Sequence, residues 1–321
     1  MTKDEKVQKK YYVTAFYRFF DWSESSTVEE HAQTLEKWCI ENNIKGLIVA
    51  SKEGFNGTVA SDTSLTPLKE HLNTLCGQDV TFKDSLTYNT NPFRRMKVKL
   101  REEIVTLGKT DISPKNEIPG GVKHMSPKDW HDFINNNPDV QLVDVRNGFE
   151  VEMGTFTNAQ NWDMNEFTEF PELVKNSDLQ KDKPVLMCCT GGIRCEKASL
   201  EMADQGYKEI YQLDGGILNY LAQYPNEHFS GECFVFDHRV AVDQNLEPSA
   251  SHALCIHCGQ PSGKEQFDCA QCGEESYGVC RTCWDKEEKY HTCSKNCAHH
   301  FEHGHKTQRI HKDAKRIKYG N

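Results

Sequence analysis

The residues with the clearest chemical meaning form a loop with the sequence Cys-Cys-Thr-Gly-Gly-Ile-Arg-Cys-Glu at 188–196. The apolar run 184–187 precedes it and predicts a buried strand, and a helix is predicted over 195–203. A cysteine at the first position of such a loop faces backbone N–H groups and the positive end of a helix dipole. Both favour the thiolate over the thiol, so we expect this sulfur to be a nucleophile near neutral pH.

The loop can be read in two registers that differ in which cysteine reacts. Counting from Cys188 gives the C-x5-R spacing of cysteine phosphatases, whereas counting from Cys189 gives C-x-x-G-x-R, a smaller ring of amides. The smaller ring suits a persulfide sulfur or a compact anion. Because Cys188 continues the apolar run, we expect it to be the last buried residue of the strand. Gly191 and Gly192 give the loop backbone freedom, and Arg194 adds a permanent positive charge. We therefore predict Cys189 as the nucleophile.

A second group of eight cysteines forms four closely spaced pairs. They are Cys255 and Cys258, Cys269 and Cys272, Cys280 and Cys283, and Cys293 and Cys297. Two such pairs make a tetrahedral four-thiolate site, so the spacing predicts two structural zinc ions in a segment with little core of its own. The pairs can combine sequentially or in an interleaved order, and both remain open. Alternatively, the cysteines are free thiols or form disulfides. Histidines are also alternative metal ligands, with His257, His291, His299 and His300 as the candidates.

The elements that must position the reactive loop begin with a domain predicted over residues 1–112. The predicted elements are a strand at 11–20, a helix at 26–43, strands at 46–50 and 57–60, a helix at 65–75, and strands at 80–86 and 96–107. Capping residues and early acids mark the first helix, and Gly and Asn mark the connection between the two short strands. The order βαββαβ predicts a ferredoxin-like, acylphosphatase-like α+β domain.

A second domain is predicted over 113–228, and it begins with a polar Pro/Gly-bearing linker at 113–121. Its predicted elements are a helix at 126–134, a strand at 140–146, helical stretches near 149 and at 167–174, strand 184–188, helix 195–203, strand 210–213 and a helix from 215. Strands that alternate with helices predict a parallel α/β sheet, with the functional loop at the carboxyl end of a strand. Regular periodicity disappears over 229–321, which predicts a small cysteine-rich module with a basic tail.

Composition limits the class of protein. The 321 residues are 37% hydrophobic and 27% charged, which is typical of a globular protein with two or three domains. No stretch approaches the ~18–20 apolar residues of a membrane span, and residues 1–10 are polar with no apolar segment after them. We therefore expect a cytoplasmic protein without a membrane partner, whose 14 cysteines are metal ligands or catalytic thiols.

The net charge of −10 does not itself favour a nucleic acid, but positive charge gathers in two runs. One run spans 94–101 and contains Arg94, Arg95 and Lys97. The other spans 306–321 and contains Lys315 and Arg316. Acidic proteins can bind RNA through such local patches, and the plain alternative is a solvated surface.

Several motifs together carry a resemblance to a known family. The strings at 142–146, 149–150, 189–194 and 213–217 resemble a rhodanese domain in order and spacing, over about residues 125–225. A wider set resembles the bacterial rhodanese-like tRNA uridine hydroxylases, which form 5-hydroxyuridine at the wobble position with molecular oxygen. That wider set consists of 53–59, 96–105, 189–198 and the cysteine-rich segment.

The resemblance implies roles for individual residues. Cys189 matches the catalytic cysteine, which is expected to act through a persulfide-type intermediate. The family's cradle around this cysteine corresponds here to Arg194 and the backbone amides of Thr190, Gly191, Gly192 and Ile193. Cys195 is expected to be either a resolving thiol or a buried residue of the first helical turn, the latter being favoured. Asp144 and Arg146 are expected to tie the strand end to neighbouring loops, with a catalytic role as the less favoured alternative.

The resemblance also implies partners. We expect tRNA as the substrate, bound at its anticodon loop, where an unstacked base can be presented, and we expect no DNA. Molecular oxygen is the implied co-substrate. Arg94, Arg95, Lys97, Lys315 and Arg316 are the candidate phosphate contacts. The alternative function is a persulfide sulfurtransferase, which would use the same Cys189.

Overall fold

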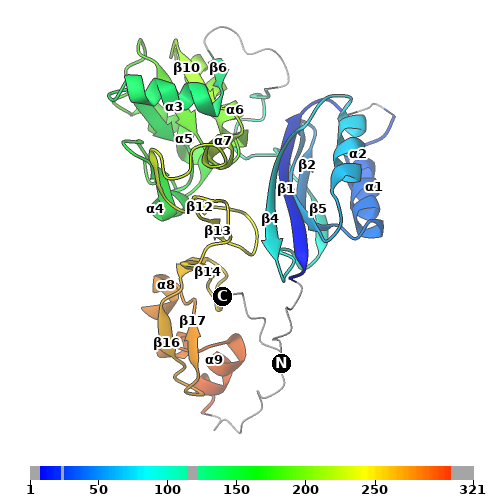
Figure 1. The fold of residues 1–321 in the computed structure, drawn as a ribbon, viewed down its shortest axis with the longest axis vertical. Helices are drawn as coiled ribbons and strands as arrows, with labels where there is room; N and C mark the ends of the chain where they lie inside the picture. The colour runs from blue at the N-terminus through cyan, green and yellow to red at the C-terminus, as the bar shows by residue number, and fades with distance from the viewer. Residues whose placement is uncertain (1–7, 23–24, 115–121, 305–321) are drawn as a thin grey trace, which may run out of the picture. The chain divides into compact units, whose positions relative to one another are not determined.

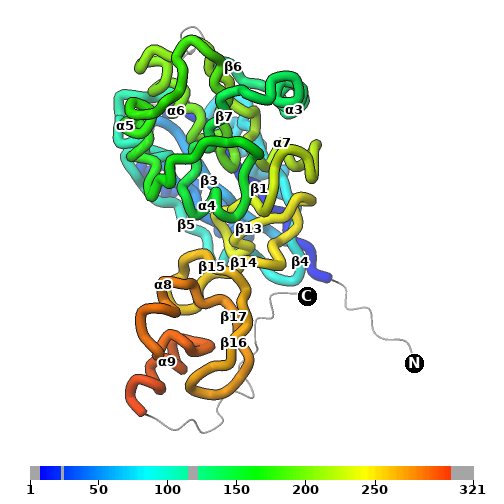
Figure 2. The backbone as a smooth tube through the Cα atoms, turned by 90° about the vertical axis from the view of Figure 1, so that its left-hand side faces the viewer, coloured from blue at the N-terminus to red at the C-terminus, as the bar shows by residue number. Residues whose placement is uncertain are grey.

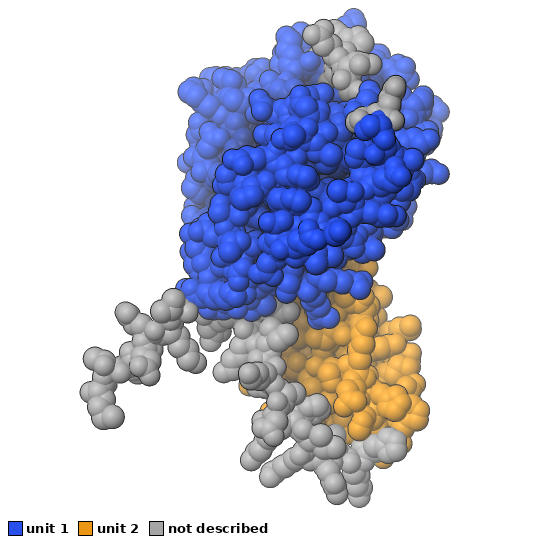
Figure 3. All heavy atoms as spheres, turned by 90° about the vertical axis from the view of Figure 1, so that its right-hand side faces the viewer, with its two compact units in different colours: residues 1–235, 242–247 blue, residues 236–241, 248–321 orange. Residues whose placement is uncertain are grey.

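The structure is a computed structural model that describes residues 8–22, 25–114 and 122–304. The chain divides into two compact units, residues 1–235 with 242–247 and residues 236–241 with 248–321 (Figure 3). Each unit is described by itself below. Within the described residues, no helix is both long and apolar enough to cross a membrane.

The first domain is a five-stranded sheet with two helices on one face (Figure 1). Its elements are β1 (Lys10–Phe19), α1 (Val28–Glu41), β2 (Lys45–Ser51), β3 (Gly54–Ser61), α2 (Thr66–Cys76), β4 (Thr81–Tyr88) and β5 (Met96–Leu100). The strand order is β4-β1-β3-β2-β5, and only the β2–β5 pair is parallel. The predicted βαββαβ order is confirmed.

The two helices of this domain bury one face of the sheet in a common core. Leu35 of α1 and Leu68 of α2 pack with Phe16, Ile48 and Phe55 of the strands, all of them buried. The start of α1 is fixed by a capping box in which Thr27 and Glu30 exchange backbone and side-chain hydrogen bonds. Because side chains alternate along a strand, the residues next to these in sequence point to the opposite face.

The second domain is built around a four-stranded parallel sheet. Its elements are β6 (Val122–Met125), α3 (Pro127–Asn136), β7 (Gln141–Asp144), α4 (Gly148–Met153), β8 (Gly154–Phe156), η1 (Phe167–Glu169), α5 (Phe170–Lys175), β9 (Val185–Cys188), α6 (Ile193–Asp204), β10 (Ile210–Leu213), α7 (Gly216–Leu221) and β11 (Phe229–Gly231). The strand order is β6-β10-β9-β7, and all pairs are parallel. The short strands β12 (Cys233–Phe234) and β13 (Ala241–Val242) follow.

Helices cover both faces of this sheet, so the predicted parallel α/β arrangement is confirmed. Figure 2 shows α5 and α6 on one side and α3 and α7 on the other. Residues of α5 and α6 pack on Val143 and Met187, whereas residues of α3 and α7 pack on Leu142 and Leu186. The loop between β9 and α6 therefore opens at the carboxyl end of a central strand, where such sheets place their functional loops.

The structure differs from the predicted strands in two places. The strand expected over 96–107 ends at Leu100, because side-chain oxygens take over as acceptors for the following backbone. Glu53 Oε1 accepts the N–H of Ile104, and Glu103 accepts those of Leu107 and Gly108. Strand β6 was not predicted, because it is short and two of its four residues are exposed at the sheet edge.

The second unit contains two β-hairpins and short helices. Its elements are β14 (His252–Leu254), β15 (Pro261–Gly263), β16 (Gln266–Asp268), β17 (Glu275–Tyr277), α8 (Arg281–Trp284), η2 (Glu288–Tyr290) and α9 (Lys295–Glu302). The hairpins pair β14 with β15 and β16 with β17. Its buried apolar cluster contains Cys255, Cys280 and Cys283 with Val279 and Tyr290 against them, which is little core for a segment of this length.

Candidate active site

The two cysteines at the end of β9 lie in different surroundings. Cys188 is the last residue of the strand and packs in the apolar core on the side of α3 and α7. Burial raises the pKa of its thiol well above the usual value. Cys189 begins the loop and faces the other side, toward α6, where its side chain is also 0% exposed.

The loop surrounds Cys189 with donors. Its Sγ accepts the backbone N–H of Gly192 at 3.1 Å. Burial alone would raise the pKa of the thiol, but the Cys195 side chain, the Arg194 charge and the backbone N–H groups of Arg194 and Cys195 lower it to about 6. The sulfur is therefore roughly nine-tenths thiolate at pH 7.

Two glycines allow the loop to close around the sulfur. Gly192 has a φ of 99°, and Gly216, just before α7, has a φ of 68°. A Cβ on Gly216 would lie 2.5 Å from the carbonyl oxygen of Cys189. This close approach lets the N–H of Ile217 donate to that oxygen at 2.9 Å and fixes the loop against α7. Gly191, in contrast, does not adopt a positive φ, and the expectation that it supplies this freedom is wrong.

Arg194 is held by a carboxylate. Its guanidinium donates to both oxygens of Glu150, at 2.5 and 2.8 Å, and both side chains are buried. Glu150 Oε1 also accepts the hydroxyl of Thr190 at 3.3 Å, and Glu150 caps the first turn of α4. Ile193, the first residue of α6, is half-buried. The charge next to Cys189 is thus oriented by a residue 44 positions away in sequence.

Asp144 and Arg146 form a buried ion pair at the end of β7. Arg146 donates to both oxygens of Asp144, with the shortest distance at 2.6 Å, and to the carbonyl of Gly154 at 2.6 Å. Thr155 donates its hydroxyl to Asp144 at 2.7 Å. These contacts join the strand end to the segment that follows α4, which is the role expected for the pair.

Cys195 lies on the first turn of α6 and is 0% exposed. Burial and the negative charge of the Cys189 thiolate raise the pKa of its thiol well above the usual value. It is therefore a neutral donor to Cys189 from a buried position on the first helical turn. The sequence favoured that position over a resolving thiol and did not indicate the donor role.

The open face of the first domain's sheet contacts this loop within the same compact unit. Tyr17 of β1 donates its hydroxyl to Glu196 of α6 at 2.9 Å. Lys197 of α6, 0% exposed, contacts Glu53 at 2.9 Å and Glu103 at 2.5 Å. Sequence reasoning missed these residues. The signal that could have found them is the aromatic pattern of β1, which is apolar on both faces and so indicates burial on both faces.

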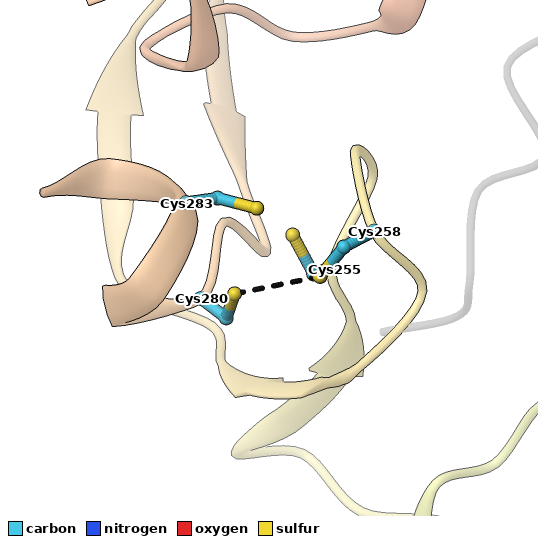
Figure 4. Close-up of side chains that lie close together, drawn as sticks. All are labelled: Cys255, Cys258, Cys280 and Cys283. Carbon is cyan, nitrogen blue, oxygen red and sulfur yellow. Dashed lines mark hydrogen bonds between the residues drawn. The ribbon is translucent and has the colours of Figure 1, made fainter. Parts of the chain in front are cut away.

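The eight cysteines of the second unit come together as two interleaved groups. One group is Cys255, Cys258, Cys280 and Cys283, shown in Figure 4, and the other is Cys269, Cys272, Cys293 and Cys297. In each group all sulfurs lie within 4.8 Å of one another. The structure thus favours the interleaved order over the sequential one that the sequence left open.

The donor geometry suits a tetrahedral metal ion. The sulfurs of Cys258 and Cys280 are 3.6 Å apart (Figure 4), and those of Cys272 and Cys293 are 3.7 Å apart. Zinc–sulfur bonds of about 2.3 Å in a tetrahedron separate sulfurs by about 3.8 Å. Backbone N–H groups from Cys258, Cys280 and His257 overcome the effect of burial and lower the pKa of Cys255 to about 6. These clusters could hold metal ions.

The histidines near these clusters have other partners. His257 Nε2 lies 2.9 Å from the carbonyl oxygen of Thr292, and His291 Nε2 lies 2.8 Å from that of Trp284. Neither residue belongs to the metal-compatible groups found in the described chain, and the same holds for His299 and His300.

Only some of the candidate RNA contacts lie within the described residues. Arg94, Arg95 and Lys97 are exposed; Lys97 lies in β5, an edge strand of the first sheet, and the two arginines lie just before it. Lys97 lies 3.7 Å from Glu36, so part of its charge is compensated. Lys315 and Arg316 lie outside the described residues.

The fold and the site define a rhodanese-like protein with two further parts. Residues 11–104 match the family described as UPF0176 acylphosphatase like domain, residues 126–223 match the rhodanese-like domain, and residues 230–298 match the rhodanase C-terminal family.

Relatives that match most of the chain identify the family more specifically. A tRNA uridine(34) hydroxylase of Bdellovibrio bacteriovorus is 44% identical over 299 residues, which cover 91% of this chain and 82% of the relative. A tRNA uridine(34) hydroxylase of Picosynechococcus is 43% identical, covering 80% of this chain and 85% of the relative. The chain belongs to the tRNA uridine(34) hydroxylase family. A solved rhodanese-like domain protein of Staphylococcus aureus is 21% identical, covering 30% of this chain and 90% of that chain with a TM-score of 0.26.

Proposed function

We propose that this protein hydroxylates uridine 34, the wobble base of tRNA, at C5 with molecular oxygen, and that Cys189 is its reactive thiolate. The observation that carries the proposal is the family membership across 91% of the chain together with a loop that lowers the pKa of Cys189 to about 6. The reaction replaces the C5 hydrogen with a hydroxyl group. It consumes one oxygen molecule, two electrons and two protons, and releases one water.

The described residues support separate tasks in this reaction. The Cys189 thiolate is the nucleophile, which Gly192, Arg194 and Cys195 hold in its charged form. Glu150 keeps the Arg194 guanidinium in place. Cys189 is 0% exposed. To reach its sulfur, the uridine must be flipped out of the anticodon loop, and the residues that cover the sulfur must move. The activity belongs in the cytoplasm, where tRNA is found.

The test compares tRNA from cells that lack this protein with tRNA from cells complemented by wild type, Cys189→Ser or Cys188→Ser. Nucleoside mass spectrometry should find 5-hydroxyuridine with wild type and with Cys188→Ser, and none with Cys189→Ser. Growth under 18O2 should place the heavy isotope in the new hydroxyl. Robust thiocyanate formation from thiosulfate, with hydroxyuridine unchanged by deletion, would instead establish the sulfurtransferase alternative.

We further propose that tRNA phosphates are held by Arg94, Arg95 and Lys97, with Lys315 and Arg316 of the tail. Support comes from the exposure of the first three, which lie in the edge strand β5 or directly before it. Binding through phosphates weakens as counterions accumulate, so the logarithm of affinity should fall linearly with the logarithm of salt concentration. Replacing all five by Gln should reduce both the affinity and that slope, whereas unchanged binding would refute this part.

We also propose that each cysteine group binds one zinc ion with a structural role. Four thiolates and no open position are typical of structural rather than catalytic zinc. The purified chain should contain two zinc ions by elemental analysis. A content well below one per chain would refute the proposal.

A further inference from the structure

Lys83 of β4 is a half-buried lysine with a shielded ammonium group, and the proposed reaction has not used it. It pairs with Ala15 of β1 in the sheet, so its side chain shares a face with Tyr17, two residues further along β1. This is the face opposite the two helices. The Lys83 Nζ is shielded from solvent and has no hydrogen-bond partner among the described residues. It lies 4.4 Å from the centre of the Tyr17 ring, a cation–π contact.

Lys83 and Tyr17 lie directly on the cysteine loop. A Cβ built on Gly191 would have the Lys83 Cδ as its nearest neighbour, at 3.8 Å. A Cβ built on Gly192 would lie 3.0 Å from the Tyr17 hydroxyl. The same hydroxyl is fixed by its hydrogen bond to Glu196. The first domain thus places the Lys83 side chain against Gly191 and the Tyr17 hydroxyl against Gly192.

Titratable groups from several elements face this ammonium group. They are Tyr17 of β1, Cys189 of the loop, Glu196 of α6 and Asp214 of the turn before α7. His124 of β6 lies 3.8 Å from Glu196, and the charge of Arg194 also acts on the Cys189 sulfur. Burial lowers the pKa of Lys83 to about 8, against the opposing effect of Cys189, Asp214 and Glu196. Between about pH 6 and pH 8, Cys189 is therefore a thiolate while Lys83 is still charged.

We propose that Lys83 is a positioning residue of the active site, contributed by the first domain, whose ammonium group stabilises the anionic form of Cys189. A buried ammonium without a hydrogen-bond acceptor is costly, and it is retained where an anion compensates it. The anionic sulfur of the loop is the first of the compensating charges, ahead of Asp214 and Glu196. The site is then assembled from two domains, and the loop of the second domain is incomplete without the sheet of the first. The assignment rests on the proposed function for the identity of Cys189 as the reacting group.

The test measures how fast iodoacetamide alkylates Cys189 as a function of pH in the full-length protein. Tryptic cleavage after Lys181 and Arg194 gives one peptide that contains Cys188 and Cys189, and fragment ions separate the two. Lys83→Met keeps the length of the side chain and removes its charge. Its rate should be roughly three- to tenfold below wild type at pH 6 and equal to wild type at pH 9, where both proteins have a full thiolate. Lys83→Arg should restore the rate at pH 6.

A matched control is Lys10→Met, since Lys10 also lies over a tyrosine of β1, Tyr12, at 4.8 Å, but is exposed. It should leave the pH profile unchanged. Equal profiles for wild type and Lys83→Met would overturn the proposal, as would a rate that falls by the same factor at every pH, because that indicates altered access rather than altered charge. The alkylation rates of the wild type and of the variants are measured without tRNA. Failure of the wild type to form hydroxyuridine would therefore count against the proposed function and leave the assignment of Lys83 to be judged on alkylation alone.

Discussion

Lys197 of α6 places its Nζ 2.9 Å from Glu53 Oε2, which joins the helix after the reactive loop to the turn between β2 and β3 of the first domain. The same Nζ lies 2.5 Å from Glu103 Oε2. Glu53 and Glu103 in turn accept backbone N–H groups from the segment 104–108. One cation thus connects the first domain, the connecting segment and the helix whose N-terminus faces Cys189.

Replacing this cation should destabilise the protein strongly. Lys197→Met leaves two carboxylates buried without their counter-charge, and breaking a buried pair of this kind costs about 3–5 kcal/mol of unfolding free energy. Urea denaturation followed by circular dichroism measures the change. The matched control is Lys97→Met, whose exposed contact with Glu36 is worth at most about 1 kcal/mol. A loss at Lys197 no larger than that at Lys97 would contradict the structural role given to this pair.

Gly216 should tolerate no side chain. Its φ of 68° disfavours any other residue, and a Cβ would lie 2.5 Å from the Cys189 carbonyl oxygen. Gly216→Ala should therefore cost at least about 2 kcal/mol of stability and raise the pH midpoint of Cys189 alkylation, because the loop amides are displaced. Gly206→Ala is the control, with a φ of 92° and nothing within 4 Å of its Cβ position. It should cost about 1 kcal/mol and leave the midpoint unchanged.

The elements around the loop follow from local patterns, which is why the sequence predicts them well. The apolar run before Cys189 and the small residues after it specify a strand, a tight loop and a helix within about twenty residues, and the structure has β9 and α6 there. The alternation of strands and helices specifies the parallel sheet in the same way.

The partners of the site residues depend on contacts that no local pattern encodes. Glu150 reaches Arg194 because α4 follows a neighbouring strand, and Tyr17 reaches Glu196 because the open face of a separate sheet packs on the loop. Both contacts join residues far apart in sequence. A single sequence gives the type of each residue but not the face against which a second domain lies. The same limit left the order of the cysteine pairs open until their spatial grouping was known.

The reactivity of the two adjacent cysteines should separate with pH. The pKa of Cys189 is lowered to about 6, so its alkylation rate should reach half of its maximum near pH 6 and level off above pH 7. The pKa of Cys188 is raised by burial, so this residue should stay unlabelled up to pH 9. Site-resolved mass spectrometry of the peptide that contains both gives the two rates in one sample. A midpoint near the ordinary pKa of a free cysteine, or labelling of Cys188 ahead of Cys189, would contradict the assignment.

The order of the cysteine pairs can be tested by counting zinc ions in double variants. In the interleaved arrangement Cys258 and Cys280 belong to one group, so Cys258→Ser with Cys280→Ser should leave one zinc ion per chain. In a sequential arrangement the same two changes would damage both sites and leave none. The complementary variant, Cys258→Ser with Cys272→Ser, removes one thiolate from each interleaved group and should leave no tightly held zinc. Because the two variants exchange their outcomes between the two arrangements, elemental analysis of the pair distinguishes them even if each change lowers the overall stability of the module. One zinc ion in the second variant and none in the first would show that the pairing is sequential.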